Sequence, residues 1–332
     1  MTALPPTRRV RPIRRPAPGR SIAAGAVAIA AVGALLLAGC GTSPRPPSPS
    51  PGETATDAAP ASREPTGTDG LLMATGGELR IMTTDGPVPF DGPSGPVVEV
   101  VVAGGVVVTV DGSGGVERSV APPAGPRSWL AVPVARGDAS NPRLLALSPD
   151  AATLALAAGE MQARSFRLVL VDLASGARRP FDVGRGLDGP PVWIGPSTVA
   201  IHTIGPGQRA GFTEVDTGTG CLADGPSFGV AFAASASGDV VAFDRALTGD
   251  VLLGPRSDTT EAGIDRLVRF PGHPDAGVER LALSADGRRL AIVRRTAAGT
   301  TIELLHELDG AWSSGQTIVN RGEQAVSVAW LE

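Results

Sequence analysis

Five residues of this chain, Gly225-Pro226-Ser227-Phe228-Gly229, match the G-x-S-x-G motif of serine hydrolases. That motif works because a sharp turn from a strand into a helix exposes the serine hydroxyl. Here the following residues, 230–234, are apolar and predict a strand, and Pro226 restricts the backbone where a strained turn needs freedom. We therefore predict an ordinary turn around Ser227 and keep hydrolysis of a glycan or an ester as the alternative function.

The three histidines, His202, His273 and His306, offer neither a convincing triad nor a metal site. They are far apart in the sequence, without the short spacing of zinc ligands. Two of them follow Ser227, as the order of nucleophile and base in such hydrolases requires, but chance gives the same order. The chain also lacks a P-loop, a dinucleotide fingerprint and an EF-hand loop. We expect no catalytic residues, no metal and no cofactor.

The elements that position these residues follow from a repeat. The segment 281–291, LALSADGRRLA, matches 145–155, LALSPDAATLA, at an offset of 136 residues. That offset equals three units of roughly 45 residues, the length of a four-stranded propeller blade. Each copy predicts two apolar strands joined by a tight turn at Asp150 or Asp286.

The two-residue period of a strand also predicts which side chains share a face. One face is expected to carry the larger apolar residues Leu281, Leu283, Leu290, Ile292, Ile302 and Leu304. The opposite face is expected to carry Ala282, Ala291 and Val293. Strands that are apolar on both faces must lie between two other layers.

Residues 68–332 continue in this style, with short apolar runs between turns rich in Gly, Pro and Asp. These 265 residues correspond to six units of about 44 residues. The innermost strands of the second to sixth units are predicted to begin near Val97, Leu144, Val192, Phe228 and Val278. The sixth unit is expected to end with a fourth strand at Gln316–Asn320.

The first unit is incomplete at both ends. Val326–Trp330 predicts an innermost strand with nothing after it, and Asp69–Ala74 predicts a second strand with nothing before it. A propeller closes its ring by completing one blade from both termini. The predicted fold is therefore all-β, a six-bladed β-propeller with ring closure by the C-terminal strand.

Some six-bladed propellers are enzymes that hold calcium in the central channel, and the innermost strands test this class. Only Glu99 and Glu279 are acidic in those strands, whereas calcium needs about six oxygen ligands. We expect the channel to be apolar core.

The paired S-P-D and S-A-D turns between apolar strands, together with the six-unit count, resemble the TolB-type bacterial propellers. The resemblance covers residues 68–332 and implies the propeller architecture and a role as an interaction protein of the cell envelope. It carries over no functional residue. The α/β domain that precedes the propeller in TolB is replaced here by a segment rich in Pro, Ser and Thr, at 41–67, which predicts a disordered tether.

Residues 1–40 have the features of an export signal. Six arginines precede an uncharged run at 21–38, and Leu37-Ala38-Gly39-Cys40 resembles the lipobox of bacterial lipoproteins. The resemblance implies that Cys40 becomes the lipidated first residue of the mature chain, with acyl chains such as palmitate. An uncleaved anchor is the alternative, because 18 residues approach the lower limit for a membrane span. Arg8-Arg9 leaves twin-arginine export open, although general secretory export fits better.

The net charge of the chain indicates which classes of partner it can bind. The whole chain has a formal net charge of −4, and removing the six arginines of the signal leaves 23 basic against 33 acidic residues, or −10. An acidic protein lacks the basic footprint of a nucleic-acid binder. Two cysteines are too few for a disulfide framework. We expect a monomer attached by Cys40 to the outer side of the cytoplasmic membrane.

The loop surface remains as a candidate site. In a propeller, the loops between blades and the hairpins between second and third strands open on one face. We name as the arginine rim those arginines predicted on that face, in hairpins or between blades: Arg164, Arg209, Arg245, Arg295, Arg136, Arg185 and Arg321. Forked guanidinium contacts would suit an anionic partner, whereas acidic residues on the same face also fit a mixed solvated surface. We expect a non-catalytic binding or scaffold lipoprotein of the cell envelope that binds a protein or anionic polymer on this loop face.

Overall fold

The computed structural model describes residues 70–331, with gaps at 84, 94, 121–126, 135–144, 159–165, 185–188, 205–209, 226–230, 246–247, 261, 273–274 and 321–326. The predicted signal, the lipidation at Cys40 and the tether at 41–67 lie outside the described residues. No helix among the residues that the structure does describe is long and apolar enough to cross a membrane.

The described residues form six four-stranded antiparallel sheets, which we call blades 1 to 6. The strands are given from innermost to outermost. Blade 1 consists of β24 (Ser327–Trp330), β1 (Leu71–Thr75), β2 (Glu78–Thr83) and β3 (Gly86–Pro89), and blade 2 of β4 (Val97–Ala103), β5 (Val106–Asp111), β6 (Val116–Val120) and β7 (Ser128–Ala131). Blade 3 consists of β8 (Leu145–Leu147), β9 (Thr153–Ala158), β10 (Phe166–Asp172) and β11 (Arg178–Gly184).

In blades 4 to 6 the strands follow the same order. Blade 4 consists of β12 (Val192–Trp193), β13 (Thr198–Ile204), β14 (Ala210–Asp216) and β15 (Leu222–Asp224), and blade 5 of β16 (Phe232–Ala234), β17 (Val240–Asp244), β18 (Val251–Pro255) and β19 (Val268–Phe270). Blade 6 consists of β20 (Gly277–Leu283), β21 (Arg289–Thr296), β22 (Gly299–Leu308) and β23 (Ala311–Asn320). Two short 3-10 turns, η1 (Arg256–Asp258) and η2 (Ile264–Arg266), lie between β18 and β19.

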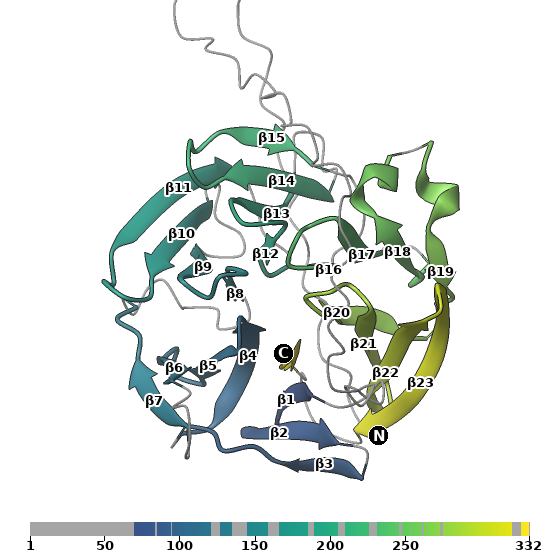
Figure 1. Cartoon of the computed structure of the whole chain (residues 1–332), viewed down its shortest axis with the longest axis horizontal. Coiled ribbons are helices and arrows are strands. Elements are labelled where there is room, and N and C mark those ends of the chain that lie inside the picture. The colour runs from purple at the N-terminus through teal and green to yellow at the C-terminus, as the bar shows by residue number, and fades with distance from the viewer. Residues whose placement is uncertain are drawn as a thin grey trace, which may run out of the picture. The chain divides into compact units, whose positions relative to one another are not determined.

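The six blades surround a central channel, as Figure 1 shows, with β4, β8, β12, β16, β20 and β24 nearest the centre. The ring closes as predicted. The last strand, β24, pairs with β1 in antiparallel register from Leu71 opposite Trp330 to Ala74 opposite Ser327. The six-bladed propeller and its closure by the C-terminal strand are thus confirmed.

The hydrophobic core lies between the blades. Six clusters of buried apolar side chains each join two adjacent blades, so every blade contributes one face to each of its neighbours. Between blades 6 and 1, for example, Val293 and Ile302 pack against Met73 and Trp330. This arrangement explains why the middle strands are apolar on both faces.

One prediction about these faces is wrong. Ile302 and Leu304 lie with Ala291 and Val293 on the face toward blade 1, and not with the leucines that face blade 5. The reason is the register, which places Ile302 opposite Val293 and Leu304 opposite Ala291. Residues directly opposite each other in a sheet share a face. The outermost strand of blade 6 also begins earlier than predicted, at Ala311.

The repeated turns are held by their own side chains. Ser148 donates a hydrogen bond to Asp150 (Oγ to Oδ1, 2.5 Å) and accepts the Thr153 N–H (2.9 Å). Ser284 donates to Asp286 in the same way, at 2.6 Å. These turns join the first and second strands of blades 3 and 6, at the end of the channel where the innermost strands finish.

A second repeat holds the turns between the third and fourth strands of blades 3 and 4. Asp172 in blade 3 and Asp216 in blade 4, 44 residues apart, each accept a backbone N–H at 2.7 Å, from Ser175 and Thr219 respectively. Both pKa values lie below the usual range: the side-chain hydrogen bond from Ser175 is the largest cause for Asp172, and the backbone bond from Thr219 for Asp216.

Candidate functional site

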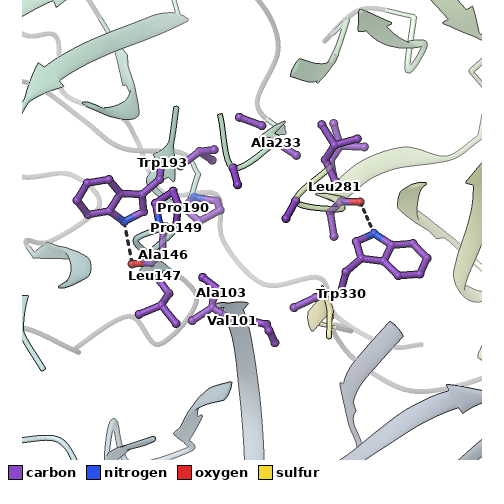
Figure 2. Close-up of a pocket in the computed structure, with 18 of the residues that line it drawn as sticks. Val101, Ala103, Ala146, Leu147, Pro149, Pro190, Trp193, Ala233, Leu281 and Trp330 are labelled. Atoms are coloured by element: carbon purple, nitrogen blue, oxygen red, sulfur yellow. Dashed lines mark hydrogen bonds between the residues drawn. The ribbon is translucent and has the colours of Figure 1, made fainter. Parts of the chain in front are cut away.

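The channel is hollow where the innermost strands end. A cavity of about 200 Å³ is bordered there by residues of all six innermost strands and of the turns that follow them. Figure 2 shows this channel mouth, with Trp193 on one side, Trp330 and Leu281 on the other, and Ala103 and Ala233 between the two sides. Apart from Ser235 and Arg280, the side chains that border the cavity are apolar, as expected, but they leave a space where filled core was predicted.

The two tryptophans at the channel mouth are fixed by equivalent hydrogen bonds. Trp193 donates its indole N–H to the Ala146 carbonyl oxygen (3.3 Å), and Trp330 donates to the Ala282 carbonyl oxygen (3.0 Å). Each bond joins an innermost strand to that of the preceding blade, and both appear as dashed lines in Figure 2. Both rings point away from the channel in Figure 2 and pack in the cores between blades 3 and 4 and between blades 6 and 1. The two bonds therefore fix the innermost strands that border the mouth.

An ion pair lies deeper along the same strands. Arg280 of β20 donates two hydrogen bonds to Glu99 of β4, one of them from Nη2 to Oε2 at 2.7 Å. Glu99 is fully buried, and the Arg280 side chain is 15% exposed. Both residues follow an irregularity in the register of their strands. The pair joins blade 6 to blade 2 beside the closing strand β24, and no sequence pattern predicts that these two residues meet.

The two acidic residues tested as calcium ligands are both in ion pairs with arginines. Glu99 binds Arg280, and Glu279 lies 3.3 Å from Arg295 (Oε1 to Nη1). Across the residues that the structure describes, no group of three or more His, Cys, Asp or Glu side chains is arranged to hold a metal ion. His202 lies on β13 and His306 on β22, in different blades, and His273 is outside the described residues.

The structure describes two members of the arginine rim. Arg245 follows β17 and Arg295 lies near the end of β21, both exposed and at hairpins between second and third strands, as predicted. The other five, Arg136, Arg164, Arg185, Arg209 and Arg321, lie outside the described residues. The rim as a whole therefore stays a prediction.

The loop that carries Arg245 is held by the buried carboxylate of Asp250. Asp250 accepts the Gly272 N–H (2.7 Å) and the Thr248 hydroxyl (2.8 Å), and it pairs with Arg269. The Gly272 bond is the largest cause that keeps the pKa of Asp250 below its usual range. The loop end of blade 5 is thereby fixed in place.

A fully buried arginine joins this loop to blade 6. Arg294 donates to the carbonyl oxygens of Gly249 (2.6 Å) and Pro271 (3.2 Å) and pairs with Glu303 (3.1 Å). Sequence reasoning missed it, although the signal was present. Arg294 shares the two-residue period of Leu290 and Ile292, whose side chains pack against blade 5.

The residues around the G-x-S-x-G motif do not continue into a helix. The segment after it forms strand β16, as predicted, whereas a nucleophile elbow needs a helix there. Gly225 donates its N–H to the Phe212 carbonyl oxygen at 2.7 Å. Ser227 itself lies outside the described residues.

Comparison by sequence identifies no relative: no protein-family model matches the chain, and no curated protein matches it. Comparison of structures does find similar folds. TolB from Acinetobacter baumannii superposes with a TM-score of 0.57 at 15% identity, over 80% of this chain and 67% of that one. A putative TolB from Agrobacterium tumefaciens gives 0.50 at 14% identity, over 76% and 90% of the two chains.

A chain of a nidogen/laminin complex superposes similarly, with a TM-score of 0.54 at 13% identity, over 79% of this chain and 99% of that one. Identities this low carry the fold alone. The described residues thus form a six-bladed β-propeller of the kind found in TolB structures, which confirms the predicted resemblance at the level of fold.

Proposed function

We propose that this protein is a non-catalytic binding lipoprotein of the cell envelope that receives an uncharged, apolar segment of a protein partner at the channel mouth. The observation that carries the proposal is the cavity of about 200 Å³ formed by all six innermost strands. The turns of blades 3 and 6 that border the cavity are held by the hydrogen bonds of Ser148 to Asp150 and of Ser284 to Asp286.

The chemistry of the mouth favours an apolar occupant. Arg280 is the one charged residue among the described residues that border the cavity, and its guanidinium is engaged by Glu99. An anion would therefore find no available positive charge among those residues, whereas apolar side chains would find other apolar side chains, such as Ala103, Ala233 and Leu281. Concave, largely apolar sites with few polar groups are typical of ligand binding.

The arginine rim is the competing surface, and it belongs to the opposite face. We retain it as the place for an anionic partner, since Arg245 and Arg295 lie at the hairpins where the rim requires them. The lipid anchor at Cys40 and the position outside the cytoplasmic membrane are part of the same proposal and rest on the lipobox sequence.

Co-purification from detergent-solubilised membranes, compared between variants, tests the proposal. Ala103→Glu and Ala234→Glu place a carboxylate at the mouth and should abolish capture of the partner. Ala223→Glu makes the same change at an exposed position on β15 and should leave capture intact.

The rim is tested in the same assay. Replacement of Arg164, Arg209 and Arg245 together by Gln should leave capture of the partner unchanged. The control replaces two arginines on the other face, Arg178 and Arg179, by Gln, and it should also leave capture unchanged. Loss of capture in the rim variant with intact capture in the mouth variants would move the binding site to the arginine rim.

The hydrolase alternative has its own test. Purified protein is screened against glycan and ester substrates beside the Ser227→Ala variant. Turnover that disappears with Ser227→Ala would replace the binding proposal by an enzymatic one.

A further inference from the structure

The outermost strand of blade 6 differs in length from the other outer edges. β23 has 10 residues, whereas β15 and β19 have three, β3 and β7 have four, and β11 has seven. No described strand pairs with the outer side of β23. An outermost strand presents a row of unpaired N–H and C=O groups, which can pair with another strand.

The chemistry of β23 differs as well. Proteins protect sheet edges with short strands, charged side chains or prolines. β11 contains two arginines, a proline and an aspartate, β15 and β19 each carry one charged residue, and β3 contains two prolines. The sequence of β23, AWSSGQTIVN, has neither a charged residue nor a proline. Of the described outer strands, β23 is therefore the one that is both long and unprotected by charge or proline.

β23 also exposes an apolar side chain, that of Val319, to solvent. Val319 is 59% exposed, the largest exposure among the large apolar residues of the described chain. Its neighbour Ile318 packs into the core between blades 6 and 1. A bulge opposite Leu304 divides β23 into two arms, and the arm Thr317–Asn320 carries Val319.

From these observations we infer that β23 pairs with β23 of a second copy of this chain, in antiparallel register through the arm Thr317–Asn320. The eight strands of two sixth blades would then form one continuous sheet across a two-fold axis. In a two-fold interface the same surface must complement itself. An uncharged strand meets this condition, because no like charges face each other, whereas β11 would set Arg178 and Arg179 against their own copies.

The absence of charge also favours a second copy over another protein. Charged groups usually supply the steering and the selection between unlike partners, and the described side chains of β23 supply none. This inference departs from the monomer expected from the sequence. It is independent of the channel mouth, which belongs to the opposite, inner edge of the blades.

Sedimentation velocity of the full chain in detergent, over a range of concentrations, tests the pairing. Wild type should form a dimer. Val319→Lys should weaken dimerisation about tenfold or more, because two cations would meet across the axis. Ser314→Lys, on the other arm, should weaken it less. Val268→Lys is the matched control, since Val268 is an exposed valine on the outermost strand of blade 5. It should leave the dimer unchanged.

Thermal unfolding of each variant verifies that the blades are intact. Wild-type protein that stays monomeric to about 0.1 mM would overturn the inference. A dimer that neither lysine on β23 weakens, or that Val268→Lys weakens equally, would also overturn it, because a different surface would then be responsible.

Discussion

Blade 6 and blade 1 are neighbours with opposite construction. Blade 6 comes from one continuous segment, and six residue pairs join its two innermost strands. Blade 1 is assembled from the two ends of the domain, and only four residue pairs join β24 to β1. No turn connects those two strands, so the chain itself does not hold them together. Their association must come from noncovalent contacts.

Those contacts gather around β24. Ser327 accepts the Val100 N–H (3.1 Å) and donates to the Val100 carbonyl oxygen (3.2 Å), which joins the closing strand to blade 2. Trp330 joins it to blade 6, and the Glu99–Arg280 pair links blades 2 and 6 directly. The comparison indicates that side-chain bonds replace the missing turn in blade 1.

The strongest test of this comparison removes the closing strand. Deletion of residues 326–332 takes away β24 with Trp330, its hydrogen bonds and its share of two core clusters. We expect insoluble protein or loss of cooperative unfolding, measured by circular dichroism on heating. A truncated chain that still unfolds cooperatively near the wild-type temperature would show that blade 1 does not depend on closure.

The next largest effect is expected from the buried ion pair. Glu99→Ala leaves Arg280 without its buried carboxylate and should lower the free energy of unfolding by about 3–5 kcal/mol. The control is Asp182→Ala, because Asp182 pairs with Arg167 on an exposed surface and should contribute less than about 1 kcal/mol. Urea denaturation measures both. Equal losses would contradict a special role for Glu99.

The two tryptophans separate closure from general blade packing. Trp330→Phe and Trp193→Phe each remove one hydrogen bond to a neighbouring strand, with an expected cost of about 1 kcal/mol plus the loss of ring contacts. If closure makes blade 1 more sensitive than blade 4 to the loss of one interstrand hydrogen bond, Trp330→Phe should lower the free energy of unfolding more than Trp193→Phe in urea denaturation. The opposite order would remove that distinction.

Acid should weaken the turns at Asp150 in blade 3 and Asp286 in blade 6, which both carry the Ser–Asp hydrogen bond. The pKa of Asp150 is lowered, chiefly by the Ser148 hydroxyl. Burial raises the pKa of Asp286, but hydrogen bonds from Ser284 and the Arg288 backbone outweigh it, and the pKa is lowered from 3.8. A folded pKa below the unfolded one means that the stabilisation is present above about pH 4 and disappears as the pH falls through the folded pKa.

We therefore expect the melting temperature to fall below about pH 4, and Ser148→Ala with Ser284→Ala to make that fall shallower. Scanning calorimetry at several pH values measures it. An unchanged slope in the double variant would assign the acid sensitivity to other carboxylates.

The smallest effect is expected from the tether. Deletion of residues 41–67 should leave the melting temperature unchanged within error, because a sequence rich in Pro, Ser and Thr has little apolar surface to bury. A clear drop would show that this segment contributes to the fold.

The sequence was sufficient for the architecture because its signals are local. Alternating apolar residues and Asp-Gly turns predict strands and hairpins, and the incomplete first unit predicts the closure at β24. The faces of Ile302 and Leu304 were wrong because they depend on cross-strand register, which a single strand does not carry. The length of β23 was underestimated because its first half, mostly small and polar, lacks an apolar alternation.

The site was less predictable for a similar reason. Glu99 and Arg280 are 181 residues apart, and only the closed ring brings them together. The cavity depends on how far the six innermost strands stand from each other, which no residue pattern encodes. Arg294, by contrast, was detectable from its spacing to Ile292.

The closure by β24 also means that blade 1 cannot be completed until the end of synthesis. The strand that completes blade 1 is the last of the domain to be made, and its Ser327 must find Val100, 227 residues earlier. At about 5–20 residues per second, β1 waits roughly 10–50 s with its inner edge unpaired. Contacts between such distant residues also form slowly. A chain that still lacks β24 therefore has an open ring that is prone to misfold, and chaperones that keep the chain unfolded until its export is complete would matter most in this interval.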